Sequence, residues 1–122
     1  MLLIDTDVLI EAFNDKNFLD LIKPFNPTVC TVVNIEAIQG SKSKQEVKKI
    51  EKFISDNFER FSNTAEDLEK ALELVRRYSS SSGILLGDAI IGATAINRNL
   101  PLFTFNQRHF RYHEIKPLLF RL

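Results

Sequence analysis

Short apolar runs alternate with helical patterns along these 122 residues, and this alternation limits the fold more than any other feature. Apolar runs without polar alternation are typical of strands buried on both faces. Strands are predicted at residues 2–5, 28–31, 60–62, 101–105 and 118–120. Helices are predicted at 6–13, 18–22, 43–58, 64–78 and 86–97, and one more carries Glu36 and ends near Gly40. Such alternation predicts an α/β sandwich with a mostly parallel central sheet flanked by helices.

Local signals set several helix ends. Ser43 is predicted to open a long helix, and the segment 64–67, Thr-Ala-Glu-Asp, resembles a capping box with Asp in place of the usual Glu. The segment Ser79 to Gly83 is predicted to be a flexible, loop-like stretch. These signals divide the chain into short elements without an internal repeat or a linker.

Three acids stand inside apolar surroundings where no structural need for a carboxylate is obvious. Asp5 ends the first apolar run, Glu36 is the only acid between Asp20 and Glu46, and Asp88 is the only acid between residues 73 and 114. An ionised carboxylate that is buried costs several kcal/mol unless it is paired or bound to a metal. The three acids therefore predict a shared cation.

The predicted topology brings these acids to one edge of the sheet. Asp5 follows the first strand, Glu36 is placed in the first turn of the helix after the second strand, and Asn106 follows the strand at 101–105. Sites in parallel sheets form beyond the carboxyl ends of the strands. Asp88, near a helix N-terminus, can point to the same edge.

Carboxylate and amide oxygens are hard ligands that suit Mg²⁺, with Mn²⁺ as the alternative ion. Such an ion can lower the pKa of a bound water and polarise a phosphoryl oxygen. His109 and His113 have no third partner for a zinc site. Taken singly, each polar residue also has a structural explanation: a helix cap for Asp5, Asp7 or Asp88, the helix dipole for Glu36, and a turn for Asn106.

Four segments in order resemble the PIN domain, and most closely the small VapC-type ribonuclease toxins of prokaryotic toxin–antitoxin pairs. They are residues 3–10, 34–40, 87–95 and 100–106. The resemblance implies one PIN domain over residues 1–122, a PIN-like three-layer sandwich, and a Mg²⁺-dependent endoribonuclease. It also implies a homodimer and a cognate antitoxin that blocks the site. Asp5, Glu36 and Asp88 match the family's catalytic, metal-binding acids, and Thr6 and Thr104 match its supporting hydroxyls.

The chain departs from the family pattern at the fourth acidic position, where Asn106 and His109 stand instead. Three carboxylates are enough for one Mg²⁺ with waters and substrate phosphate. We therefore expect Asn106 to ligate or orient water, and Asp7 to cap a helix or support a ligand. His109 is a candidate RNA contact or a plain surface side chain.

Two other functions fit parts of the pattern. The segment Asp5-Thr6-Asp7 after a strand also resembles the nucleophile motif of haloacid-dehalogenase-type phosphatases, in which Asp5 would attack phosphorus and Asp7 would act as general acid. A non-catalytic RNA-binding or protein-binding module is the other alternative, although it would need none of the three acids.

Charge and composition add predictions about partners and location. The net charge is zero, but lysines crowd residues 42–52 and arginines the last 25 residues. Basic patches bind phosphates whatever the total charge. The candidate RNA contacts are Lys44, Lys48, Lys52, Arg108 and His109. Solvated helix faces are the alternative for these lysines.

The single cysteine, the lack of a leader and the lack of an apolar span predict a cytoplasmic protein with no membrane contact.

Overall fold

The four strands form one parallel sheet in a computed structural model that describes residues 1–82 and 84–122. They are β1 (Leu2–Ile4), β2 (Pro27–Cys30), β3 (Glu59–Phe61) and β4 (Leu102–Phe103), in the order β3-β2-β1-β4. Leu3 stands opposite Thr28 on one side and Leu102 on the other. All three strand pairs are parallel, which confirms the predicted mostly parallel sheet.

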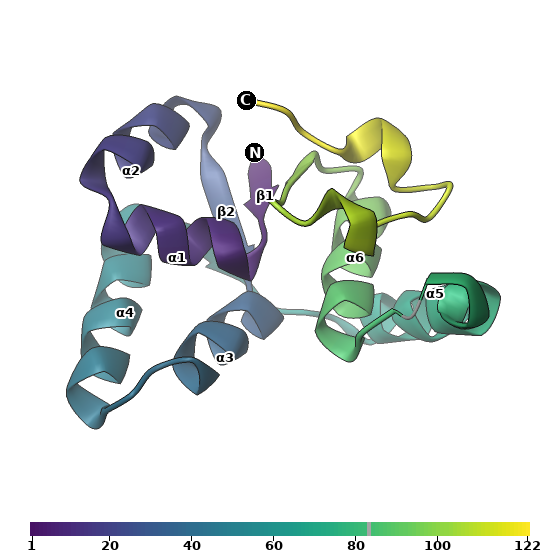
Figure 1. Cartoon of the computed structure of the whole chain (residues 1–122), viewed down its shortest axis with the longest axis horizontal. Helices are drawn as coiled ribbons and strands as arrows, with labels where there is room; N and C mark the ends of the chain where they lie inside the picture. Colours follow the sequence, from purple (N-terminus) through teal and green to yellow (C-terminus); the bar gives the residue numbers. More distant parts are fainter. Residues whose placement is uncertain (83) are drawn as a thin grey trace.

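Helices cover both faces of this sheet (Figure 1). One face carries α1 (Thr6–Asn14), α2 (Lys16–Ile22), α3 (Thr31–Gln39) and α4 (Lys44–Asn57), and the other carries α5 (Ala65–Ser82) and α6 (Leu86–Arg98). Short 3-10 turns, η1 (Lys23–Phe25), η2 (Gln107–His109) and η3 (Lys116–Leu118), complete the chain. The arrangement is the three-layer α/β sandwich that the alternation of elements predicted. No helix in the described part of the chain is long and apolar enough to cross a membrane.

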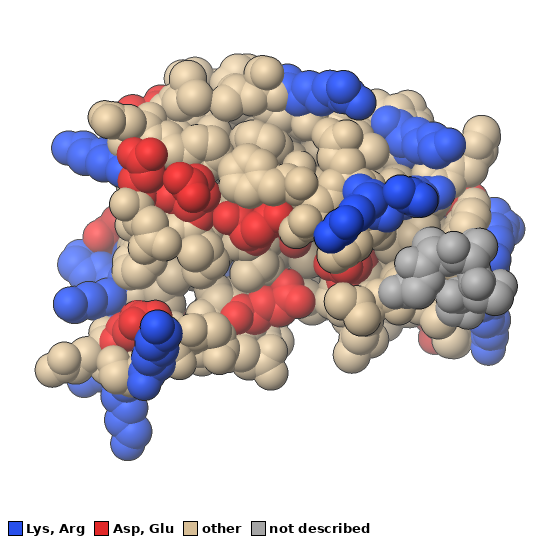
Figure 2. All heavy atoms as spheres, viewed as in Figure 1, with Lys and Arg blue, Asp and Glu red and all other residues tan. Residues whose placement is uncertain are grey.

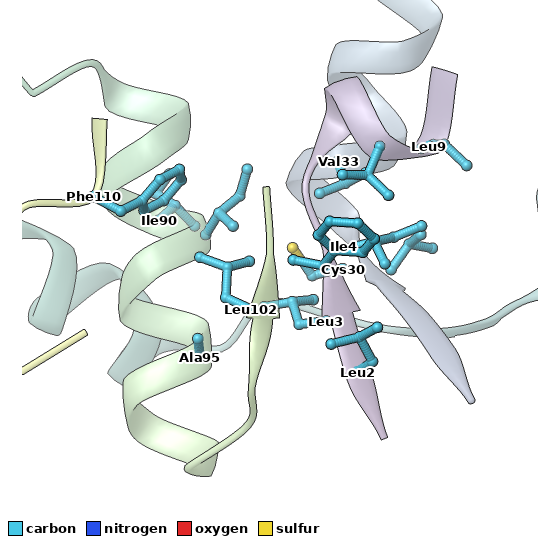
Figure 3. Packing of buried hydrophobic residues seen from close by; sticks show 14 of the residues in the cluster. Leu2, Leu3, Ile4, Leu9, Cys30, Val33, Ile90, Ala95, Leu102 and Phe110 are labelled. Atoms are coloured by element: carbon cyan, nitrogen blue, oxygen red, sulfur yellow. The ribbon is translucent and has the colours of Figure 1, made fainter. Parts of the chain in front are cut away.

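The core lies on both faces of the sheet. Figure 3 shows Phe110 and Ile90 packed on the α6 side and Leu9 and Val33 on the α1 side, with Leu3 in the strand layer between them. The side chains of β1 are at most 1% exposed. Cys30 is also fully buried, as its place in an apolar strand predicted. Burial on both faces explains why these strands lack polar alternation.

Two predicted helix starts are confirmed. The Ser43 hydroxyl accepts from the Glu46 N–H at 3.1 Å. In the capping box, the Thr64 N–H donates to Asp67 Oδ2 at 2.8 Å, and the Asp67 N–H donates to Thr64 Oγ1 at 3.2 Å. Asp67 also accepts from Arg98 at 2.7 Å, so the same acid ties α5 to α6.

Three local predictions were wrong. Helix α5 continues through Ser82, so Ser79 to Ser82 do not form a loop; Gly83 lies outside the described residues. Serine costs a helix only a fraction of a kcal/mol per residue, and α5 packs along α6. Residues 118–120 contribute a single bridge between Leu102 and Leu119 instead of a strand, because Pro117 sits in the first turn of η3.

The third error concerns α3. This helix begins at Thr31, which had been assigned to the preceding strand. Glu36 therefore lies in the second turn of α3, beyond the reach of the N-terminal dipole that could have explained it.

Candidate active site

Asp5 is held at the carboxyl end of β1, where it is the N-cap of α1 and only 6% exposed. Its Oδ1 accepts from the Thr6 N–H at 2.8 Å, and its Oδ2 accepts from Thr104 Oγ1 at 2.7 Å. Burial raises the pKa of Asp5, and the hydrogen bonds from Thr104 and Thr6 oppose this rise. The two hydroxyl-bearing residues thus orient a carboxylate that burial would otherwise make costly.

Glu36 reaches the same edge from α3. Its Oε1 accepts from Thr6 Oγ1 at 2.5 Å, so Thr6 links the first two acids. On the other side, α6 approaches Glu36 at Gly87, where a Cβ atom would overlap Glu36 Oε2. Glycine at residue 87 therefore leaves the space that the second carboxylate oxygen occupies.

Replacement of Gly87 by alanine should reduce activity without unfolding the protein. The new methyl group would push the Glu36 carboxylate out of its present position, and supporting changes around a metal site cost about 10- to 100-fold in metal affinity or activity. Cleavage of RNA, the activity that the resemblance to the PIN domain implies, would measure the loss, and circular dichroism would check the fold. Gly40→Ala is the matched control, because a Cβ there meets only backbone oxygens at 3.6 Å or more. Equal activity of the two variants would contradict this reading of Gly87.

Asp88 lies in the first turn of α6 beside His109. The His109 Nδ1 and Asp88 Oδ2 atoms are 3.3 Å apart, and the two side chains are 40% and 15% exposed. Burial and then the charge of Asp5 raise the pKa of Asp88 to about 6, with a smaller rise from Glu36, while His109 opposes the rise. The histidine that was a candidate RNA contact is therefore placed against a predicted metal ligand.

Asp7 and Asn106 complete the group. Asn106 Nδ2 donates to Asp7 Oδ2 at 2.9 Å, and the Asn106 N–H donates to Thr104 Oγ1 at 3.0 Å. Burial and then the charge of Asp5 raise the pKa of Asp7 to about 6, and the charge of Asp88 adds to the rise. Asn106 thus uses its amide nitrogen to hold an acid, which leaves its amide oxygen for a ligand or a water.

Charge repulsion among these acids is what a divalent cation would relieve. The charge of Asp5 raises the pKa of both Asp7 and Asp88, the charge of Asp88 also raises that of Asp7, and all the possible ligating atoms are hard oxygens. Within the described residues, no group of three or more Asp, Glu, His or Cys side chains is arranged so that it could hold a metal ion by itself. Mg²⁺ commonly uses one or two carboxylates and fills its shell with waters and substrate phosphates. The residues therefore fit an open divalent site better than a closed cage.

The predicted RNA contacts are spread unevenly around the acids. Lys44 and Lys48 are exposed on α4, and Lys52 pairs with Asp56 at 2.9 Å. None of these three lines the groove of about 630 Å³ that contains Thr6 and Glu36, whereas Lys49 does. Lys49 lies next to Ile50, which is buried, and outside the predicted stripe of Lys44, Lys48 and Lys52.

Figure 2 shows acidic side chains gathered toward the middle of this face, with Lys and Arg side chains on both sides of them. One basic group lies over the C-terminal segment, where Arg108 lines a second groove that also contains Thr104 and Asn106. The site is therefore an acidic centre between two grooves.

Comparison with known proteins places this arrangement in a family. The model of the PIN domain matches residues 2–115. Ribonuclease VapC10 of Mycobacterium tuberculosis is 29% identical over 123 residues, which cover 96% of this chain and 92% of the relative.

Solved structures show the same fold. A toxin–antitoxin complex from Klebsiella pneumoniae has a TM-score of 0.74 at 23% identity and covers 93% of this chain and 92% of its own. VapBC2 from Rickettsia felis, bound to a promoter DNA fragment, has a TM-score of 0.72 at 22% identity, with coverages of 97% and 95%. VapBC-1 from nontypeable Haemophilus influenzae has a TM-score of 0.74 at 17% identity, with coverages of 98% and 96%. Since the family model spans nearly the whole chain, this protein belongs to the PIN-domain family.

Proposed function

We propose that this protein is a metal-dependent endoribonuclease that hydrolyses RNA phosphodiester bonds and acts as the toxin of a toxin–antitoxin pair. The observation that supports the proposal is that Thr6 links Asp5 to Glu36 at the carboxyl edge of the sheet, and that the charges of both acids act on Asp88. The curated relative over nearly the same length is named a ribonuclease. The haloacid-dehalogenase alternative has no such support, because the chain belongs to a different family.

In the proposed reaction, Asp5, Glu36 and Asp88 would hold the ion, Mg²⁺ with Mn²⁺ as the alternative. When bound, such an ion activates a water and stabilises charge on the phosphoryl oxygens. Thr104 and Thr6 fix the carboxylates of Asp5 and Glu36 through their hydroxyl groups. Asn106 orients the Asp7 carboxylate by donating to its Oδ2 atom.

Purified protein tests this proposal directly. It should cleave single-stranded RNA in Mg²⁺ or Mn²⁺, and EDTA should stop the reaction, because the acids repel one another and phosphate when no cation is present. Cleavage that continues unchanged in EDTA would contradict the metal requirement. A phosphoenzyme trapped on Asp5 would instead favour the phosphatase chemistry.

The proposed partners follow from the same family. The structural neighbours are themselves described as toxin–antitoxin complexes, so we assign this chain a cognate antitoxin and a cytoplasmic location. We also propose a homodimer, because Leu68 and Leu72 on α5 are 54% and 43% exposed. Exposed leucines on one helix face are typical of an interface. Light scattering should then report twice the 14.0 kDa mass of the chain.

A lysine prediction follows from the groove beside Glu36. Lys49→Gln should weaken RNA binding, because this side chain lines the groove that reaches the acids. One phosphate contact fewer should lower the slope of log affinity against log salt by about 0.7 for a single strand. Lys48→Gln, exposed and outside the groove, is the matched control. Filter binding at several salt concentrations measures both. If substitution of Lys44, Lys48 or Lys52 weakens RNA binding more than substitution of Lys49 does, the RNA path runs over the outer face of α4.

A further inference from the structure

A half-exposed phenylalanine lies directly beside the acidic centre. Phe105 is 50% exposed and stands between Thr104, which holds Asp5, and Asn106, which holds Asp7. Hydrogen bonding from the Phe105 backbone also lowers the pKa of Asp7. The backbone of Phe105 is thus tied to the carboxylates, and its position relative to the site is fixed.

Other aromatic rings support the Phe105 ring from the protein side. Its centroid lies 5.7 Å from that of Phe18 and 5.5 Å from that of Phe103, with interplanar angles of 52° and 81°. Edge and tilted contacts of this kind are the preferred geometries of aromatic pairs. The ring is therefore held in place although half of its surface faces solvent.

The groove next to Phe105 is basic. It has a volume of about 600 Å³, and its lining includes Arg108 and Arg121 but no carboxylate side chain of the described residues. Neither arginine forms an ion pair with any residue that the structure describes. Guanidinium groups bind phosphate through paired donors. A half-exposed aromatic ring, beside two guanidinium groups that form no ion pair among the described residues, matches the two parts of a nucleotide.

We propose that this groove binds one nucleotide of the RNA next to the scissile phosphate, with its base stacked on Phe105 and its phosphates bound by Arg108 and Arg121. The inference rests on the proposed function and adds a binding subsite to it. Stacking is sequence-tolerant because every base has a π-face, and loss of one stacked base costs about 5- to 150-fold in affinity. Phe105 would position the chain so that the neighbouring phosphodiester faces Asp5 and Asp88.

Tryptophan fluorescence can test the stacking directly, because the chain contains no tryptophan. Phe105→Trp in an Asp5→Asn background places a single fluorophore in the groove of a protein that should not cleave its ligand. A short single-stranded RNA should quench this fluorescence, and the same strand with abasic positions should quench it much less. Phe25→Trp is the control, since Phe25 is 42% exposed in the same aromatic cluster but does not line the groove. Equal quenching by the abasic strand, or at residue 25, would overturn the proposal.

Kinetics separate this subsite from the catalytic proposal. Phe105→Ala should raise KM for RNA by about 5- to 150-fold, with kcat nearly unchanged, and Phe105→Tyr should restore KM. Phe25→Ala should resemble the parent protein.

If the parent cleaves RNA and Phe105→Ala has the same KM, the subsite is wrong and the nuclease assignment stands. If Phe105→Ala changes only inhibition by the antitoxin, the groove is a protein interface and the inference is overturned. If the parent never cleaves RNA, the proposed function fails, and fluorescence quenching in the Phe105→Trp variant alone decides whether the groove binds nucleotides.

Discussion

Purified Asp5→Asn protein should lose RNA cleavage by more than about 100-fold, because changes to groups that merely support a metal ligand already cost about 10- to 100-fold. The substitution removes the most buried of the three acids and keeps an oxygen that can accept from the Thr6 N–H. Burial already raises the pKa of Asp5, so removal of its charge should not destabilise the fold. Gel assays in Mg²⁺ and thermal unfolding of the same preparation measure the two effects.

A matched control for Asp5→Asn lies on the surface of α4. Asp56 makes only an exposed pair with Lys52 among the described residues, and such pairs contribute about 1 kcal/mol or less. Asp56→Asn should therefore cleave RNA like the parent protein. Undiminished cleavage by Asp5→Asn, in a preparation free of contaminating nuclease, would remove Asp5 from the site.

Without metal, the protein should become less stable as the pH rises from about 4 to about 6. The pKa values of Asp7 and Asp88 rise from 3.8 to about 6 on folding. Between these values the folded state holds protons that the unfolded state has released, so the free energy of unfolding falls with increasing pH and levels off above about pH 6. Each pKa unit corresponds to about 1.4 kcal/mol. Partial exposure and shared repulsion reduce the combined effect to about 2–3 kcal/mol.

Urea unfolding in EDTA at pH 4.5 and pH 7 measures this difference. Asp88→Asn should remove a large part of it, because it deletes one of the two titrating groups and the repulsion that Asp5 exerts on it. Saturating Mg²⁺ at pH 7 should stabilise the parent protein by about 2.7 kcal/mol at one hundred times its Kd, and by less at pH 5, where protons compete for the carboxylates. A stability that rises from pH 4.5 to pH 7 in EDTA would contradict the raised pKa values.

Local sequence patterns were sufficient for much of the architecture. Strands β1 and β2 are buried on both faces, and this burial appears in the sequence as apolar runs without alternation. The capping box at Thr64 and Asp67 needs only residues three apart, so it could be predicted with its hydrogen bonds. The end of α5 could not, because a run of serines leaves helix and loop close in free energy, and packing along α6 decides between them.

In the candidate site, too, some features could be predicted from local sequence patterns and others depend on packing. The apolar surroundings of Asp5, Glu36 and Asp88 were sufficient to predict that these acids share a site, because a charged residue in an apolar run needs a partner and parallel strands bring their carboxyl ends to one edge. Which groups touch depends on the packing of distant elements: Thr6 bridges Asp5 and Glu36, His109 pairs with Asp88, and Gly87 makes room for a carboxylate oxygen. The hydrogen bond from Thr104 to Asp5 joins residues 99 positions apart, and the geometry of all these contacts depends on how α3, α6 and the segment after β4 pack at ångström scale. Sequence periodicity records which face of an element is apolar, but it carries no information about the distance between side chains on different elements.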